Sequence, residues 1–271
     1  MLYLVSTPIG NLEDFSYRAV ATLKKCHYIL CEDTRHSKSL LNHYGIETPL
    51  RSFHQFNEAK SEEKVIEDLQ AAKTIALISD AGTPLISDPG SKLVLRCRAE
   101  GIPVSAIPGP CAVIDALVLS GFSTTPFQFL GFLPKKQSEL DALLTQVLFY
   151  PGTTIAYESP HRIEKTLEVM RTKDPKKIIC VARELTKLYE ECLFGTAEEL
   201  LTHFQKNPPR GEIVLLLAPS EPRACYEHLS LQELVTLLQE DLHLTKNEAI
   251  KTAAQMRGLP KKEVYKHFTN D

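Results

Sequence analysis

Short apolar runs alternate with amphipathic stretches over the first 120 residues. The apolar runs have the length and the leucine-rich or β-branched composition of buried strands, and they cover residues 2–6, 28–31, 74–79 and 103–107. The stretches between them have helical spacing and predict helices at 17–25, 38–44, 58–71 (capped by Asn57), 90–100 and 112–119. Such regular alternation is typical of a largely parallel sheet covered by helices.

The pattern breaks around residues 121–126 and a second α/β region begins. Its expected strands are 127–132, 153–157, 178–182, 190–194 and 213–217, with helices near 137–149, 160–171 and 197–205. Glu221-Pro222-Arg223 has the composition of a linker, and three short helices are expected after it. Two of these helices begin with capping boxes, Ser230-x-x-Glu233 and Thr245-x-x-Glu248.

The length of the chain supports more than one domain. Its 271 residues exceed what one compact core usually holds. The pattern divides the chain into an α/β domain at 1–122, a second α/β domain at 123–222 and a helical module at 223–271.

The charge excludes a protein that binds polyanions with its whole surface. The chain has 31 basic and 34 acidic residues and a formal charge of -3, so any nucleic acid must be held by a local basic patch.

The seven cysteines include no CxxC pair, and their odd number fits reduced thiols in a cytoplasmic protein. The N-terminal residues lack a basic signal-peptide region, and the longest apolar run, 213–218, is too short for a membrane span.

Common cofactor motifs are missing from the sequence. There is no GxGxxG after a strand, no P-loop and no HExxH. The histidines and cysteines have no paired metal-ligand spacing, so we expect no metal.

Three loops rich in glycine and proline follow predicted strands of the first domain. They are residues 7–11, 80–84 and 108–112. In an open parallel sheet the carboxyl ends of the strands form the ligand-binding edge, so these loops should converge there. None of them contains Lys or Arg, and the nearby charged residues are acidic: Glu32, Asp33, Asp80 and Asp88. The composition favours a cationic or zwitterionic ligand contacted by backbone groups.

Two strand ends of the second domain have a different chemistry. Residues 157–162 (Tyr-Glu-Ser-Pro-His-Arg) bring an acid, an imidazole and a guanidinium to a strand-to-helix junction, where we expect Ser159 as the N-cap. Residues 183–187 (Arg-Glu-Leu-Thr-Lys) follow another strand. Together with Lys135-Lys136 these segments form either a basic lip for phosphates or an ordinary solvated charge run, and their spacing does not separate the two.

Six motifs in this order resemble the bacterial ribosomal RNA small-subunit methyltransferase I family, within the tetrapyrrole methylase superfamily. They are residues 6–12 (STPIGNL), 31–35 (CEDTR), 79–90 (SDAGTPLISDPG), 131–134 (GFLP), 157–162 and 182–187 (ARELTK). The resemblance covers about residues 1–217 and implies a two-domain class III methyltransferase fold and a homodimer. It also implies that S-adenosylmethionine binds in the cleft between the domains and donates a methyl group to the ribose 2'-hydroxyl of a decoding-centre cytidine in 16S rRNA of the 30S subunit.

The resemblance also implies which residues contact the cofactor. They are Pro8, Ile9, Gly10, Asp80, Gly82, Thr83, Pro84, Ile86, Cys111, Ala112, Tyr157 and Gly211. The sequence departs from the family at three positions. Cys111 replaces the usual serine, Arg210 stands where lysine is common, and Leu140 stands where a basic residue is expected.

Two hypotheses describe the group that removes the hydroxyl proton. One is Glu158 with His161, and the other is Lys187 tuned by Glu184. The expected contacts to the RNA are Arg35, Lys135, Lys136, Arg162, Arg183, Lys261 and Lys262.

The C-terminal helices resemble a helix-turn-helix module. Residues 243–268 contain six basic residues against two acidic ones, which favours RNA binding. The alternative is a helical cap that packs a dimer or improves solubility.

Two other functions stay open at the level of the sequence. A tetrapyrrole methylase of the precorrin or uroporphyrinogen type would share the cofactor loops but would need no basic C-terminal module. A nucleic-acid-binding regulator that has lost catalysis would not need the intact loops at 7–11 and 80–90.

Overall fold

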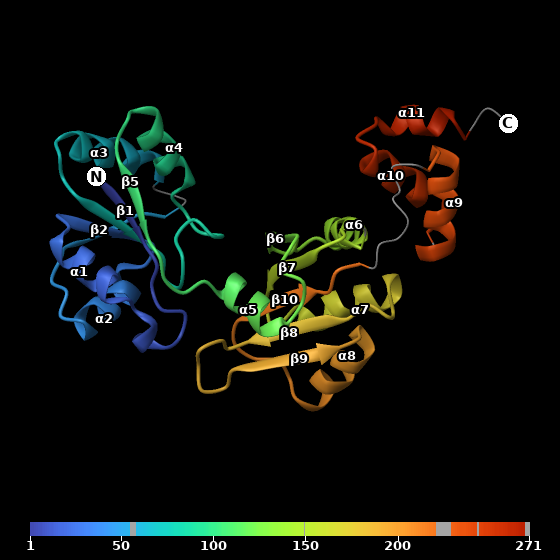
Figure 1. Ribbon diagram of the computed structural model, residues 1–271, viewed down its shortest axis with the longest axis horizontal. Coiled ribbons are helices and arrows are strands. Elements are labelled where there is room, and N and C mark those ends of the chain that lie inside the picture. Colours follow the sequence, from blue (N-terminus) through green and yellow to red (C-terminus); the bar gives the residue numbers. More distant parts are fainter. Residues whose placement is uncertain (55–57, 149, 221–228, 243, 269–271) are drawn as a thin grey trace. The chain divides into compact units, whose positions relative to one another are not determined.

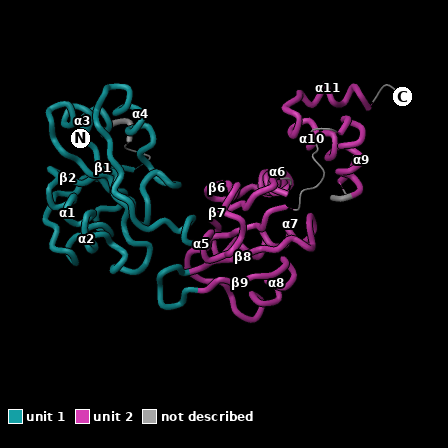
Figure 2. Tube along the Cα trace, viewed as in Figure 1, with its two compact units in different colours: residues 1–115, 184–190 teal, residues 116–183, 191–271 magenta. Residues whose placement is uncertain are grey.

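The computed structural model describes residues 1–54, 58–148, 150–220, 229–242 and 244–268, with side chains described except at 58–60 and 241–242. The expected Asn57 cap and the expected linker at 221–223 lie outside these residues. The chain forms two compact units, shown in Figure 2. Unit 1 comprises residues 1–115 and 184–190, and unit 2 comprises 116–183 and 191–271. Unit 1 thus ends at residue 115 in the first part of the chain and also includes the loop 184–190, which is distant in sequence.

Unit 1 contains a five-stranded parallel sheet. Its strands are β1 (Leu2–Val5), β2 (Tyr28–Cys31), β3 (Leu50–Ser52), β4 (Ile75–Ile78) and β5 (Val104–Ile107), in the order β3-β2-β4-β1-β5. Its helices are α1 (Tyr17–Lys25), α2 (Thr34–His43), α3 (Glu58–Gln70) and α4 (Ser91–Ala99), with a 3-10 turn, η1, at Leu12–Asp14. Helix α5 (Ala112–Ser120) crosses the boundary between the units.

The helices of unit 1 cover both faces of this sheet (Figure 1). Alternate strand residues point to opposite faces. Leu30 and Leu77 pack in a cluster with α3 and α4, whereas Ile29 and Ile78 pack in a second cluster with α1 and α2. The near-continuous apolar composition of these strands follows from burial on both faces.

Two elements of unit 1 differ from the sequence prediction. Strand β3 was not expected, because three residues with two polar side chains give no strand pattern; it forms by pairing Leu50 with Ile29 at the sheet edge. Helix α2 begins at Thr34 rather than 38, because the Asp33 carboxylate caps it by accepting from Arg35 N at 2.8 Å. The remaining boundaries agree within about two residues.

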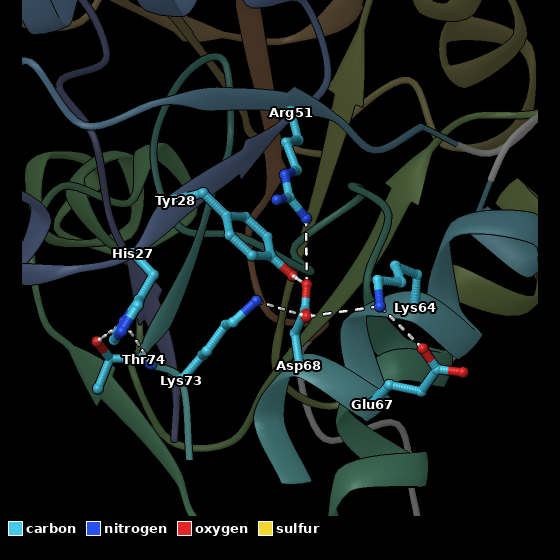
Figure 3. A network of polar contacts seen from close by, with 8 residues as sticks. All are labelled: His27, Tyr28, Arg51, Lys64, Glu67, Asp68, Lys73 and Thr74. Atoms are coloured by element: carbon cyan, nitrogen blue, oxygen red, sulfur yellow. Dashed lines mark hydrogen bonds and ion pairs between the residues drawn. The ribbon is translucent and has the colours of Figure 1, made fainter. Parts of the chain in front are cut away.

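A polar network ties together three elements at the start of β2 (Figure 3). The Asp68 carboxylate on α3 is buried and accepts from the Tyr28 hydroxyl at 3.0 Å, from Arg51 at 3.2 Å and from Lys73 at 2.8 Å. The Arg51 guanidinium also lies 3.6 Å from the centre of the Tyr28 ring. These partners lower the pKa of Asp68 to about 2, with the Lys73 hydrogen bond as the largest cause.

Unit 2 contains a mixed five-stranded sheet in the order β6-β7-β10-β8-β9. The strands are β6 (Phe127–Phe132), β7 (Thr153–Glu158), β8 (Ile179–Arg183), β9 (Glu191–Gly195) and β10 (Ile213–Leu217); only the β6–β7 pair is parallel. Its helices are α6 (Gln137–Val147), α7 (Ile163–Lys173), α8 (Ala197–Lys206), α9 (Leu231–Leu242), α10 (Lys246–Met256) and α11 (Lys261–Lys266). Leu140, where the family pattern led us to expect a basic residue, is 2% exposed in the core of this unit.

Both capping boxes predicted before the C-terminal helices are present. Glu233 N donates to Ser230 Oγ and Ser230 N donates to the Glu233 carboxylate; Thr245 and Glu248 make the same reciprocal pair. Gly258-Leu259-Pro260 separates α10 from α11. No helix in the described ranges is both long and apolar enough to cross a membrane.

Candidate functional site

The three Gly/Pro-rich loops of unit 1 converge at the carboxyl end of its sheet, as the sequence predicted. Strand β1 lies between β4 and β5, and all three run in parallel. The loops that leave them, residues 7–11, 80–84 and 108–112, are therefore neighbours at one edge.

Hydrogen bonds join these loops into one structure. Thr7 and Gly82 exchange both backbone bonds, with Thr7 N donating to Gly82 O at 2.9 Å and Gly82 N donating to Thr7 O at 3.1 Å. The Ser6 and Thr83 hydroxyls are 3.1 Å apart, and Thr83 Oγ1 donates to Pro110 O at 3.0 Å. Thr83, expected from the resemblance to contact the cofactor, thus also connects the second loop to the third.

Two glycines let the backbones of these loops come close to one another. Gly82 has φ +83°, and a Cβ atom there would lie 3.1 Å from Ile9 Cγ2. A Cβ atom on Gly109 would lie 2.9 Å from Ser6 Cβ. The edge is consequently lined by peptide groups and small side chains.

The carboxylates near these loops are close to one another. Asp80 accepts from Asp33 N at 3.3 Å, and Asp88 accepts from the Ser79 hydroxyl at 2.5 Å. Burial, followed by repulsion from neighbouring carboxylates, raises the pKa of Glu32; burial also raises that of Asp88, with Asp80 adding to the effect. A cation bound here would offset this repulsion.

The remaining unit 1 residues expected at the cofactor surround the same edge. Pro8, Ile9 and Pro84 are buried, Gly10 is exposed and Ile86 is 37% exposed. Cys111 and Ala112 lie where α5 begins, and Asp115 N donates to Cys111 O at 3.0 Å.

The loop 184–190 brings a lysine to the first of these loops. Asn11 N donates to Thr186 Oγ1 at 3.1 Å, and Lys187 Nζ donates to Glu184 Oε1 at 2.9 Å. A Cβ atom on Gly10 would collide with Lys187 Cγ and would lie 3.0 Å from Thr186 Oγ1. The sequence singled out Lys187 and Glu184 but not their place beside Gly10, because no local pattern links residues so far apart in the chain.

Unit 2 gathers several predicted residues at one edge of its own sheet. Register pairs Phe132 with Tyr157, Glu158 with Ile213 and Ile213 with Arg183, and Gly211 precedes β10. Arg183 Nε donates to Glu191 Oε2 at 2.6 Å. The roles of Tyr157 and Gly211 in cofactor binding stay predictions.

The Glu158 carboxylate is buried, and both of its oxygens accept hydrogen bonds. Its Oε2 accepts from Thr166 Oγ1 at 2.7 Å, its Oε1 accepts from Ser159 N at 2.8 Å, and Arg162 Nη1 lies 3.4 Å from Oε1. With a side chain that is 0% exposed, Glu158 serves in this geometry to hold the β7–α7 junction.

The expected N-cap at Ser159 is wrong by three residues. Helix α7 begins at Ile163 with Arg162 as its N-cap, and Ser159 instead caps the turn before it: His161 N donates to Ser159 Oγ at 3.2 Å. Pro160 lies in this extra turn. His161 is exposed on it.

Arg162 holds the loop that follows β6. Its guanidinium donates to Leu133 O at 3.2 Å and to Pro134 O at 2.5 Å. Lys135 and Lys136 come directly afterwards and are exposed, with Lys136 paired to Glu139 at 3.2 Å.

The other residues expected to contact the RNA lie in other segments of the chain. Arg35 pairs with Asp33 at 3.0 Å, and Lys261 and Lys262 are exposed on α11.

Among the residues that the structure describes, no group of three or more His, Cys, Asp or Glu side chains is arranged to hold a metal ion.

Comparison with known proteins places this fold and loop set in a family. The model of the tetrapyrrole (corrin/porphyrin) methylases matches residues 1–201. A solved cobalt precorrin-4 methyltransferase has a TM-score of 0.59 at 14% identity and covers 80% of this chain and 94% of its own, and a diphthine synthase has a TM-score of 0.60 at 12% identity, covering 80% and 90%. These likenesses show the class III methyltransferase fold.

Two curated relatives narrow the family further. The ribosomal RNA small subunit methyltransferase I of Halalkalibacterium halodurans is 42% identical over 268 residues, which is 97% of this chain and 93% of the relative. That of Bacillus subtilis is 43% identical over 270 residues, or 98% and 92%. The chain belongs to the ribosomal RNA small subunit methyltransferase I family, a branch of the tetrapyrrole methylases. The methyl donor of this family is S-adenosylmethionine.

Proposed function

We propose that this protein transfers a methyl group from S-adenosylmethionine to the ribose 2'-hydroxyl of a cytidine in 16S rRNA. The observation that carries the proposal is the extent of the similarity. The tetrapyrrole methylase model ends at residue 201, whereas the rRNA methyltransferase relatives match 97–98% of the chain, including α9 to α11. A methylase of small tetrapyrroles would not require these helices, of which α10 and α11 carry exposed lysines.

The residues of the unit 1 edge fit the proposed cofactor. Carboxylates at Glu32, Asp80 and Asp88 suit a sulfonium cation, and the peptide-lined loops at 7–11 and 80–84 suit its polar groups. When bound, S-adenosylmethionine supplies a methyl group that its sulfonium charge already activates. The protein must then hold the 2'-oxygen close to that carbon and in line with the carbon–sulfur bond.

Of the two hypotheses for the base, the geometry favours the Glu184–Lys187 pair. Glu158 is buried and both of its oxygens accept hydrogen bonds, so removing a proton would require it to give up partners. Lys187 and Glu184 lie beside Gly10, next to the proposed cofactor loops. We propose that this pair takes the 2'-hydroxyl proton.

The substrate partner is proposed to be the 30S subunit in the cytoplasm. Lys135, Lys136, Lys261 and Lys262 are exposed cations that suit phosphate contacts. Arg162 and Arg183 already have partners within the protein, so their proposed contribution is to shape the surface as well as to attract phosphates. Arg35, paired with Asp33, is proposed as a further contact.

The proposed homodimer is supported by exposed apolar side chains of unit 2. Val118 is 69% exposed, Leu119 is 48% exposed and Phe194 is 49% exposed. The centroids of the Phe194 and Phe122 rings lie 6.2 Å apart. A second copy of the chain would cover them. Val118→Asp should convert a dimer to a monomer in light scattering, and an unchanged mass, or a monomeric wild type, would contradict this assembly.

The function is tested by offering three substrates side by side. Labelled S-adenosylmethionine is incubated with the protein and either 30S subunits from a strain lacking this gene, naked 16S rRNA or a uroporphyrinogen. We expect label in RNA, recovered as 2'-O-methylcytidine after nuclease digestion, and none in the porphyrinogen. Label in the porphyrinogen alone, or on a base, would contradict the proposal.

A further inference from the structure

An exposed phenylalanine stands at the end of β6 in unit 2. Phe132 is the last residue of this edge strand and is 64% exposed. The register of β6 against β7 shifts between Phe129 and Phe132, and Gly131 has φ +69°. Such an irregularity redirects the side chain that follows it.

The Phe132 ring is supported from within unit 2. Its centroid lies 5.3 Å from that of Tyr157, whose ring in turn contacts Phe129 at 5.1 Å with an edge-on angle of 72°. These contacts favour a fixed ring orientation. Little ordering entropy would then be lost when a planar partner stacks on it.

Cations follow this ring closely in the chain. Leu133 is buried, and the Arg162 guanidinium fixes the carbonyls of Leu133 and Pro134. Lys135 and Lys136 come next and are exposed. The lysines lie three and four residues after the exposed ring, on a loop held by an arginine. Proteins bind unpaired nucleotides with this combination, because bases stack on aromatic rings while cations contact the phosphates.

We infer that Phe132 is a stacking platform for an unpaired nucleobase of the substrate RNA, with Lys135 and Lys136 contacting the adjoining phosphates. The inference rests on the proposed function and deepens it. The hydroxyl to be methylated must be accessible, and a base held by stacking would fix the ribose to which it is attached. The competing occupant of the ring is the adenine of S-adenosylmethionine, because Phe132 contacts Tyr157, a residue expected at the cofactor.

Two substitutions separate stacking from simple apolar contact. Phe132→Leu keeps apolar bulk but removes the ring, and Phe132→Tyr keeps the ring. We expect Phe132→Leu to lower kcat/KM for 30S subunits about 5- to 150-fold, the range that base–aromatic stacking gives. Phe132→Tyr should remain within about twofold of wild type, and the Kd for S-adenosylmethionine from calorimetry should be unchanged in both variants.

The matched control is Phe127→Leu. Phe127 is the first residue of the same strand and is 40% exposed, and we expect its replacement to leave kcat/KM for the subunit unchanged. The inference is overturned if Phe132→Leu has no effect, if Phe132→Tyr is equally impaired, or if the Kd for S-adenosylmethionine weakens in proportion. Wild-type protein that methylates no RNA would overturn the proposed function and this inference with it; an active wild type with a fully active Phe132→Leu variant would overturn only the inference.

Discussion

The Lys187 side chain lies against Gly10, so that residue 10 has no room for a Cβ atom. Gly10→Ala should therefore displace the loop 184–190 and destabilise the protein by about 1–3 kcal/mol, as overpacking does. Thermal unfolding of the full chain measures this cost. In a Lys187→Ala background, which removes the colliding Cγ, the same substitution should cost less than half as much. An equal loss in both backgrounds would show that the contact is not the cause.

The Glu184–Lys187 pair should matter to the chemical step. Lys187→Ala and Glu184→Gln are each expected to lower the single-turnover methylation rate at saturating cofactor by about 10²–10⁴-fold, the contribution of a positioned base. The control is Leu188→Ala in the same loop, where the side chain is 88% exposed and no change is expected. Near-normal rates for both variants would contradict this pair as the base, and the protein would then contribute to catalysis only by positioning the substrate and the cofactor.

Glu158 depends on Arg162 for its counter-charge. Arg162→Met should destabilise the protein by about 3 kcal/mol, because it leaves a buried carboxylate without its cation. Adding Glu158→Gln should restore part of that stability. Arg171→Met is the matched control, since its pair with Glu198 is exposed and should be worth less than about 1 kcal/mol. A double variant no more stable than Arg162→Met would contradict the pairing.

The Asp68 network should make stability depend on acid. The pKa of Asp68 is lowered in the folded state to about 2 from its ordinary value of 3.8, so the contribution of Asp68 to stability is present above pH 4 and is lost as the pH falls towards 2. Asp68→Asn should cost about 1–3 kcal/mol at pH 7. The difference in unfolding free energy between variant and wild type should shrink below pH 4. Glu67→Gln, at an exposed pair with Lys64, should cost little at any pH, and a pH-independent Asp68→Asn effect would refute the account.

Lys261 and Lys262 should contribute to RNA affinity through charge. Replacing either by alanine is expected to weaken 30S binding and to reduce the slope of log K against log salt by about 1, the signature of one lost phosphate contact. Lys64→Ala on α3, exposed and paired with Glu67, is the control and should leave the slope unchanged. Unchanged slopes for the α11 variants would favour a helical cap that packs a dimer or improves solubility.

The local patterns of the sequence account for most of the fold. Strands β1 and β4 are apolar throughout because both faces are covered, and Ser16, Thr196 and Thr245 mark helix starts by accepting from the amide three residues later. The parallel order that brings the three loops together followed from the alternation of strands and helices. Strand β3 escaped prediction because it depends on its neighbour β2 rather than on its own three residues.

The sequence alone predicted less of the candidate site than of the fold. Glu158 looked like a catalytic base because a carboxylate, a histidine and an arginine share one junction, but its environment depends on Thr166, eight residues later on α7. The contact of Lys187 with Gly10 joins residues far apart in the chain, and only the folded structure reveals it. Phe132 lies in the motif at 131–134, but the sequence did not indicate its exposure, because that exposure results from the irregular register of β6.

The most direct test of the proposed activity is mass spectrometry of 16S rRNA from a strain that lacks this gene, before and after incubation of its 30S subunits with the protein and S-adenosylmethionine. The account predicts the gain of one methyl group on the ribose of a single decoding-centre cytidine. An rRNA mass unchanged by the protein, or a methyl group found on a nucleobase, would contradict it.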